Sequence, residues 1–514
     1  MSRRYLFLTV FMGGMTTLAI EFTTSRMLQT VYGTSNIVWA NVIGLVLLFL
    51  TTGYFVGGRW ADRNPSPHLF YSLVTAAGGS SIFFLLLTSV ILKSASAALA
   101  TFDVGAVAGS LVGVIIALAV PITLLGCLSP FAIRLGVRNV AEAGAISGQI
   151  YAISTLGSLL GTYLPTLFII PLAGTRATAV IFGTILLVVG LIGLWQVGRK
   201  TAATATVASL FLIPFVAWGL GGTLKTAEGQ IFETESGYNY IQVVERGGCT
   251  YLLLNEGQAY HSYYCAAGQP ERVSVWSMML AAPYFYAEPP QVSRMAVIGL
   301  AAGTIPKLYL QAYPEAHVDG IEIDGAIIQA GYDFFALRDE RIRTIVGDGR
   351  YELNQLTGNY EVITIDAYKV PYIPWHLTTV EFFEEVRGQL TADGVVAINV
   401  GRAPNDRRLV EALTATLQQV FPSVHTVDVP GTLNTILFAT VQPTNAADLA
   451  THTPTHPLVA QVVGAAVSSL QPTTAGDGVL FTDNRAPVET IVDSLVMRYL
   501  LQEGLAGLPS VNEQ

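Results

Sequence analysis

Long apolar runs dominate the first 222 residues, and this feature limits the possible folds more than any other. Seven runs approach the roughly 20 apolar residues that a helix needs to cross a bilayer. The whole chain is 52% hydrophobic and only 12% charged, a balance typical of membrane proteins. We therefore expect a multi-span α-helical membrane domain over residues 1–222, with spans near 5–30, 36–58, 69–92, 105–130, 146–170, 177–197 and 203–222.

The loops between these runs indicate an orientation. With the N-terminus in the cytoplasm, the inner loops hold eight Lys or Arg residues and the outer positions hold four, in agreement with the positive-inside rule. Seven spans would then place the C-terminal half outside the cytoplasm, and one miscounted span reverses that conclusion. The start "MSRRYLFLTV" lacks a clear cleavage site, so we interpret it as part of the first span. We expect a multi-pass protein of the cell membrane, with the lipid bilayer as a partner.

The two halves of the chain differ in charge. Residues 1–225 carry a balance of +8 and the remainder carries −17, which gives the net −9. Nucleic acid needs a basic surface, so the acidic half argues against a nucleic-acid partner. The acidic balance suits a cationic small substrate, although acidic surfaces also simply favour solubility.

Beyond the Gly-rich segment "GLGGTLKTAEGQ" (219–230) the pattern changes to alternating, β-branched and aromatic residues, which predicts a small β-hairpin domain over 223–290. Strands and helices then alternate, which predicts a doubly wound α/β domain, Rossmann-like and of methyltransferase type, over 291–445. Its strands are expected near 295–300, 317–323, 342–346, 360–366, 394–400, 423–428 and 434–441. The C-terminal extension, 446–514, looks loop-rich as far as 480, and "FTDNRAPVET" (481–490) predicts a turn before a last helix.

Two cysteines lie in the predicted β domain. If residues 250–264 form a hairpin that turns near Gly257, Cys249 and Cys265 face each other within disulfide range. A disulfide would agree with an extracytoplasmic domain. Two unrelated free thiols are the other interpretation. No Cys/His cluster suggests a metal site.

Chemistry-bearing residues follow the first four strands of the α/β domain. Gly299 and Gly303 follow the first strand, Glu322 ends the second, Asp348 and Gly349 follow the third, and Asp366 ends the fourth. Carboxyl ends of parallel strands meet at one edge of a sheet, where such folds bind ligands. Small residues let a ligand approach the backbone, and a carboxylate accepts both ribose hydroxyls. A phosphate loop and a strict GxGxxG are missing, so the pattern favours an adenosyl sulfonium over a dinucleotide. The alternative is a set of tight turns and helix caps.

Five segments carry a specific resemblance. "VIGLAAGT", "GIEIDGAII", "RIRTIVGDGRYEL", "YEVITIDAY" and "TTVEFFEEVRGQLTADGVVAINV" resemble the polyamine aminopropyltransferases, the spermidine synthase family, within residues 238–440. With the apolar half in front, the chain looks like the membrane-fused spermidine synthase-like proteins. The resemblance implies that Gln258 contacts the thioadenosine and Glu322 the ribose. It also implies that Asp348 and Gly349 hold the adenine and that Asp366 accepts a proton.

The resemblance further implies a reaction. An aminopropyl group would pass from decarboxylated S-adenosylmethionine to an amine such as putrescine, with release of methylthioadenosine, no metal, and a homodimer as the assembly. The attacking amine must be neutral although amines have pKa values near 10. A buried carboxylate such as Asp366 can position the amine and take its proton.

The sequence departs from the family pattern at the polyamine end of the pocket. Ala302 and Lys369 stand where the family usually has Asp, and Val275–Ser277 replaces its Tyr-His-Glu triplet. A different, aromatic acceptor site is one interpretation, since cations bind aromatic faces. Packing or a membrane-surface contact is the other. The aromatic candidates are Tyr368, Tyr372, Trp375 and His376.

Two other functions remain open. A methyltransferase that uses intact S-adenosylmethionine is compatible with Ala302, because an Asp there would repel the carboxylate of the intact cofactor. A non-enzymatic, nucleoside-sensing module that regulates the membrane bundle is the third reading.

Overall fold

The computed structural model describes residues 2–32, 36–99, 104–225, 227–255, 259–266, 268, 272–369, 372–473 and 479–503. The chain forms two compact units. The first comprises residues 1–227 and 233–240, and the second comprises 228–232 and 241–514. The division into four domains at residues 222, 290 and 445 stays a prediction.

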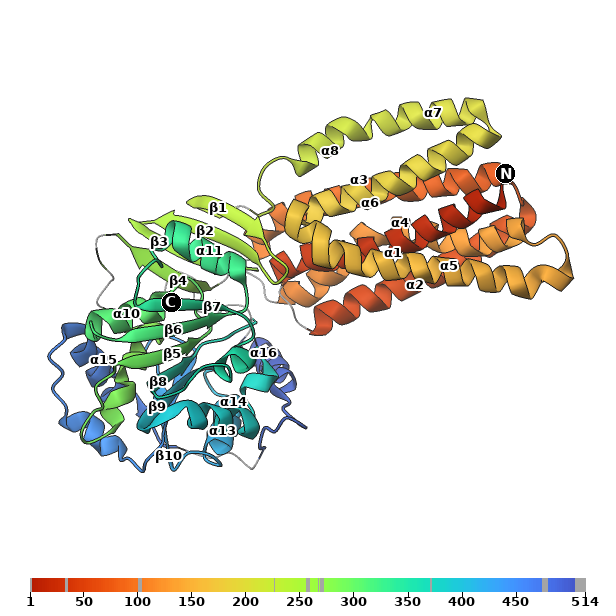
Figure 1. The fold of residues 1–514 in the computed structure, drawn as a ribbon. Coiled ribbons are helices and arrows are strands. Elements are labelled where there is room, and N and C mark those ends of the chain that lie inside the picture. Colours follow the sequence, from red (N-terminus) through yellow and green to blue (C-terminus); the bar gives the residue numbers. More distant parts are fainter. Residues whose placement is uncertain are drawn as a thin grey trace. The chain divides into compact units, whose positions relative to one another are not determined.

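The first unit is a helical bundle (Figure 1). Within the described residues, six helical segments are long and apolar enough to cross a membrane. The helices are α1 (Arg3–Tyr32), α2 (Asn36–Arg63), α3 (Pro67–Leu99), α4 (Val104–Gly136), α5 (Ala143–Leu164), α6 (Ile170–Val197), α7 (Arg199–Leu210) and α8 (Leu212–Leu220), with short turns η1 (Val140–Glu142) and η2 (Pro165–Ile169).

The fifth of these segments, Val140–Val197, contains two of the expected spans. It has 58 residues, so a straight helix would be about 87 Å long against a hydrocarbon core of about 30 Å. The helix is broken at Gly174, whose φ of 81° and ψ of 166° are not helical. Figure 1 shows α5 and α6 running in opposite directions, so the chain turns back at this end. The two runs expected at 146–170 and 177–197 are therefore separate arms of one segment.

Glycines allow the bundle to pack tightly. A Cβ built on Gly53 would lie 2.3 Å from the carbonyl oxygen of Thr123, and one on Gly57 would lie 2.5 Å from Cα of Cys127. Helices α2 and α4 therefore meet backbone to backbone, as small residues permit in membrane bundles.

The predicted small β domain is a four-stranded sheet in the order β1-β2-β3-β4. Its strands are β1 (Gln230–Glu235), β2 (Tyr240–Arg246), β3 (Cys249–Leu254) and β4 (Tyr260–Cys265). Strands β3 and β4 are antiparallel, with Cys249 opposite Cys265. These two cysteines form a disulfide. The hairpin geometry expected from the sequence is thus present, and the reading as two free thiols is wrong.

The second unit contains an eight-stranded sheet in the order β12-β10-β11-β9-β8-β5-β6-β7. Strands β5 to β9 run parallel to one another, and β11 lies antiparallel between β9 and β10. All seven predicted strands are present, and the predicted α/β fold is confirmed. The strands are β5 (Arg294–Ile298), β6 (His317–Glu322), β7 (Ile342–Val346), β8 (Tyr360–Ile365), β9 (Leu390–Gly401), β10 (Ser423–Asp428), β11 (Asn434–Thr440) and β12 (Leu470–Gln471).

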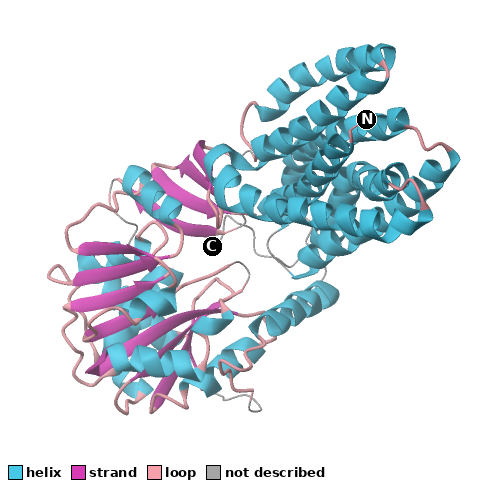
Figure 2. Ribbon diagram, turned by 45° about the vertical axis from the view of Figure 1, so that its right-hand side comes forward, coloured by secondary structure: helices cyan, strands magenta, loops and turns pink. Residues whose placement is uncertain are grey.

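Helices cover both faces of this sheet (Figure 2). Side chains of β5 alternate between two cores, because successive residues of a strand face opposite sides. Met295 and Val297 pack in one core, and Ala296 and Ile298 pack in the other. The helices are α9 (Val275–Met278), α10 (Thr304–Ala312), α11 (Gly325–Phe334), α12 (Gly349–Leu353), α13 (Val380–Gln389), α14 (Arg408–Leu417), α15 (Pro457–Ser468) and α16 (Val488–Glu503), with short turns η3 (Met279–Phe285), η4 (Trp375–Leu377) and η5 (Ala446–Thr451).

The C-terminal extension differs from expectation. Residues 443–480, expected to be loop-rich, contain α15 and β12. Leu458, Val459 and Val462 of α15 are buried in the same core as Met295. The extension is therefore part of the α/β fold, since its apolar face completes one of the two cores.

Candidate active site

The turn between β5 and α10 forms one end of the candidate site. Gly299 has a φ of 89°, and a Cβ built on it would lie 2.4 Å from the carbonyl oxygen of Asp366. Glycine alone tolerates this conformation and this approach, so the ends of β5 and β8 meet here. Gly303, also with a φ of 89°, is the N-cap of α10. Both predicted glycines shape the turn at the carboxyl edge of the sheet.

Glu322 ends the neighbouring strand β6 and is buried. Its Oε2 accepts the N–H of Ala301 at 2.9 Å, and its Oε1 accepts the N–H of Asp324 at 3.1 Å. Burial raises the pKa of Glu322 and these hydrogen bonds lower it. Burial has the larger effect, and the resulting pKa is about 7. A carboxylate has about four acceptor positions, so Glu322 can still accept two hydroxyl groups.

Asp348 caps α12, which begins at the predicted Gly349. Its Oδ1 accepts the N–H groups of Arg350 and Tyr351, both at 3.1 Å, and its Oδ2 lies 2.8 Å from Nε2 of His376. Burial raises the pKa of Asp348, but the bonds from Tyr351 and His376 outweigh it and hold that pKa below its usual range. The structure thus places His376, predicted at the acceptor end, beside a residue predicted for the adenine.

A charge cluster that the sequence analysis missed supports this end. The guanidinium of Arg350 donates to Glu385 through Nε and Nη2 and to Asp483 through Nη1 and Nη2, at 2.6–3.1 Å. Its Nη1 also lies 3.3 Å from the carbonyl oxygen of His376. Arg350 directly follows the Asp-Gly pair in the sequence and Asp483 lies in "FTDNRAPVET". These two sequence positions were the only hint in the sequence that Arg350 and Asp483 belong to the site.

Asp366 follows β8 and is held by two donors. Nδ2 of Asn399 donates to Oδ1 at 2.9 Å, and Nε1 of Trp276 donates to Oδ2 at 3.1 Å. Burial raises the pKa of Asp366 to about 6, and both hydrogen bonds lower it. The carboxyl group is therefore oriented and mostly ionised at neutral pH.

Sequence reasoning missed Asn399 and gave Trp276 only as a departure from a family pattern. Asn399 is a polar residue in the otherwise apolar end of β9, which was the available signal. Since a carboxylate only accepts, the amide nitrogen must face Asp366. Within the described residues, Oδ1 of this buried side chain has no hydrogen-bond partner.

Two of the predicted aromatic acceptor residues make hydrogen bonds within the fold, and the aromatic acceptor site stays a prediction. The hydroxyl of Tyr368 donates to the carbonyl oxygen of Asn399 and accepts the N–H of Gly401, both at 3.0 Å. The hydroxyl of Tyr372 donates to Asp493. These two tyrosines therefore support the loop after β8.

Three further predictions concern the rim of the site. Trp375 is 46% exposed and Lys369 is exposed. Gln258 lies outside the described residues. Within the described residues, no group of three His, Cys, Asp or Glu side chains is arranged to hold a metal ion.

The chain is similar to several known proteins. A sequence profile of the spermine/spermidine synthase domain matches residues 298–451. A probable polyamine aminopropyl transferase of Bifidobacterium longum is 30% identical over 249 residues, which cover 48% of this chain and 54% of the relative. The polyamine aminopropyltransferase of Vibrio vulnificus is 29% identical over 208 residues, which cover 39% and 68%. The eEF1A lysine and N-terminal methyltransferase of Mus musculus is 25% identical over 198 residues, which cover 36% and 28%.

Among solved structures, a probable spermidine synthase from Corynebacterium glutamicum aligns with 50% of this chain and 97% of its own, at 20% identity and a TM-score of 0.41. The chain spans about half the length of the Bifidobacterium relative. The resemblance predicted from the sequence is confirmed: residues 298–451 match the spermine/spermidine synthase domain.

Proposed function

We propose that this chain is a membrane-anchored, spermidine synthase-like transferase. It moves an aminopropyl group from decarboxylated S-adenosylmethionine to an amine and releases methylthioadenosine. The observation that carries the proposal is Asp366, which two donors orient at the carboxyl edge of the sheet. Glu322 and Asp348 at the same edge would bind the ribose and the adenine of the donor, with Gln258 on the thioadenosine.

The chemistry needs one base. The amine nitrogen forms a bond to the carbon next to sulfur, the carbon–sulfur bond breaks, and its electron pair neutralises the sulfonium. The amine proton passes to Asp366, whose pKa of about 6 leaves it ionised at neutral pH. Holding both reactants in line supplies much of the remaining acceleration. No step requires a metal.

The acceptor is an amine because its N–H groups can donate to the carboxylate of Asp366, which also attracts a cationic amine. Putrescine is the reference acceptor, although a second ammonium would meet the exposed Lys369 rather than a carboxylate. The buried Ala302 likewise offers no charge to the amine of the donor.

Methyl transfer from intact S-adenosylmethionine is the second candidate. Ala302 favours it, because the intact cofactor adds a carboxylate that an Asp at this position would repel. The similarity to the mouse relative, which is named as a methyltransferase, also favours methyl transfer. The two reactions leave different products, methylthioadenosine and S-adenosylhomocysteine.

The proposed location is the cell membrane, with the catalytic half outside the cytoplasm. The long apolar helices support the membrane location. The Cys249–Cys265 disulfide supports a position outside the cytoplasm, since disulfides persist in oxidising compartments. A homodimer is the proposed assembly, on the family resemblance alone.

The test incubates the detergent-solubilised full chain with decarboxylated S-adenosylmethionine and a panel of mono-, di- and polyamines. We expect amine-dependent release of methylthioadenosine, measured by chromatography, and a loss of about 10²-fold or more in Asp366→Asn because the proton acceptor is gone. Asp393→Asn is the matched control, since this exposed carboxylate lies at the other end of β9.

Three outcomes are informative. Release that is lost in Asp366→Asn and kept in Asp393→Asn supports aminopropyl transfer. Formation of S-adenosylhomocysteine from the intact cofactor selects methyl transfer instead. Nucleoside binding without either product contradicts both enzymatic proposals and leaves a sensing module.

A further inference from the structure

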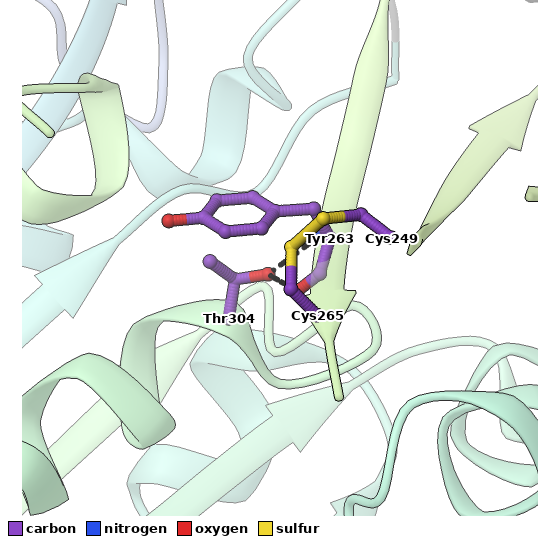
Figure 3. The surroundings of a disulfide bond; sticks show 4 residues. All are labelled: Cys249, Tyr263, Cys265 and Thr304. Atoms are coloured by element: carbon purple, nitrogen blue, oxygen red, sulfur yellow. Dashed lines mark hydrogen bonds between the residues drawn. A yellow bond between two sulfur atoms is a disulfide. The ribbon is translucent and has the colours of Figure 1, made fainter. Parts of the chain in front are cut away.

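The β3–β4 hairpin is closed by a covalent bond close to the candidate site. Cys249 is the first residue of β3 and Cys265 is the last residue of β4, so the disulfide joins the open end of the hairpin. Figure 3 shows this bond next to Tyr263 and Thr304. A bond at this place fixes the register of β4 against β3.

Strand β4 is also hydrogen-bonded to the loop that follows β5. Oγ of Ser262 accepts the N–H of Ala302 at 3.0 Å. Oγ1 of Thr304, the first residue of α10, accepts the N–H of Tyr263 at 2.9 Å and donates to its carbonyl oxygen at 3.1 Å. Three hydrogen bonds thus connect two neighbouring residues of β4 to the turn between Gly299 and α10, and all four residues are buried.

The same strand also reaches the proposed base. The ring of Tyr263 packs against the ring of Trp276 with centroids 5.4 Å apart. Trp276 donates its indole N–H to Asp366. Tyr263 is 1% exposed and also interacts with Arg272, whose guanidinium carbon lies 5.7 Å from the ring centroid. A shift of β4 would therefore displace the indole that orients the carboxylate.

We infer that the Cys249–Cys265 disulfide is a redox-sensitive positioning device that keeps both ends of the active site in place through Tyr263. The backbone of Tyr263 positions the nucleoside turn, and its ring positions Asp366 through Trp276. Neither Tyr263 nor Trp276 needs to touch the reacting atoms for this role. The oxidised protein is the fast form and the reduced protein is the slow form.

The switching step is thiol–disulfide exchange with a dithiol. Two electrons and two protons pass from the dithiol to the protein, the bond between Cys249 and Cys265 breaks, and two thiols form while the dithiol becomes a cyclic disulfide. Oxidation reverses the step. Cys127, the one other cysteine of the chain, is buried in the helical bundle and takes no part.

The experiment compares the full chain before reduction, after dithiothreitol, and after reoxidation, with methylthioadenosine release as the assay. On reduction we expect kcat to fall about tenfold and KM for the donor to rise, because a misplacement of about 1 Å can cost up to 10²-fold in rate. The acid limb of the pH profile should also move to higher pH as Asp366 loses its indole donor. Reoxidation should restore kcat, KM for the donor and the acid limb of the pH profile.

Variants separate positioning from general stability. Cys127→Ser should respond to dithiothreitol like the unmodified chain, and the double variant Cys249→Ser/Cys265→Ser should behave like the reduced form and ignore the reagent. Tyr263→Leu keeps the disulfide and should still shift the acid limb. This variant tests the connection from Tyr263 through Trp276 to Asp366 even if the cysteine variants do not fold.

The inference uses the proposed function, but its failure can be distinguished. If no amine supports release, methylthioadenosine affinity and amide hydrogen exchange at Tyr263 still report on the hairpin. Faster exchange and weaker binding after reduction support the inference without any turnover. Unchanged kcat, KM, pH profile, affinity and exchange in the reduced protein would overturn it.

Discussion

At the scale of single residues, Asp366 depends on its two donors. Hydrogen bonds to the ionised form of a carboxyl group lower its pKa, and here they offset part of the rise caused by burial. The indole N–H of Trp276 cannot accept a proton, so it always acts as a donor. It therefore favours the form of Asp366 that a base requires.

Replacing Trp276 with Phe should move the acid limb of the kcat/KM profile upward from about pH 6. A hydrogen bond to a charged group contributes about 1.5 kcal/mol, and 1.36 kcal/mol corresponds to one pKa unit, so we expect a shift of about one unit. Trp195→Phe, an exposed position on α6, is the control. A Trp276→Phe profile identical to that of the parent would show that the indole does not tune the base.

Glu322 should make nucleoside affinity depend on pH. Its pKa of about 7 is raised by burial, so the carboxylate is ionised above pH 7 and protonated below. The ionised form accepts hydroxyl donors more strongly, and methylthioadenosine should bind more weakly at pH 6 than at pH 8 by calorimetry. Glu322→Gln should bind about tenfold more weakly at pH 8 and lose the dependence, while Glu340→Gln, at an exposed position, should change neither. A pH dependence that survives in Glu322→Gln would assign it to another group.

At the scale of elements, the turn before α16 closes onto the start of α12. Arg350 lies between Glu385 and Asp483, with its side chain 18% exposed and that of Asp483 41% exposed. Bidentate pairs of this kind hold both partners in a fixed geometry. The C-terminal extension thereby supports Asp348 from 135 residues further along the chain.

Asp483→Asn should destabilise the protein by about 1 kcal/mol, since partial exposure screens the lost charge. For a domain of this size the thermal midpoint should fall by about 2–4 °C, and methylthioadenosine should bind more weakly because α12 carries Asp348. Asp333→Asn is the control, because its pair with Arg338 is long, at 3.8 Å, and exposed. Equal effects from the two substitutions would mean that the Arg350 cluster has no special role.

The positions of the strands could be predicted from the sequence, whereas the side-chain contacts between distant residues could not. Strands β5, β6, β8 and β9 contain buried apolar runs that end at a glycine or an acid, so both their positions and the edge carrying Glu322 could be predicted. Helix α15 was missed, although Leu458, Val459 and Val462 follow a helical spacing, because the surrounding Pro, Thr and Gly residues resemble a loop. The bonds of Trp276 and Asn399 to Asp366 join residues 90 and 33 positions apart. No local pattern encodes such a meeting.

At the scale of the whole molecule, the number of crossings decides where the chemistry takes place. Within the part of the chain that the structure describes, counting α5 and α6 as separate arms around Gly174 turns the six candidate spans into seven. With the N-terminus inside, an odd number would place the proposed catalytic half outside, where a disulfide is stable. The proposed sulfonium donor would then have to be supplied outside the cytoplasm.

Engineered cysteines on both sides of the last segment test this topology. In a Cys127→Ser background, a membrane-impermeant maleimide should label Asp393→Cys in intact cells, because this exposed residue belongs to the catalytic half. Lys200→Cys, exposed at the start of α7, should be labelled only after permeabilisation, because a basic segment between two spans stays inside. The reverse pattern would place the catalytic half in the cytoplasm. Reducing conditions there would leave Cys249 and Cys265 as thiols, so the membrane orientation determines the redox state of the hairpin.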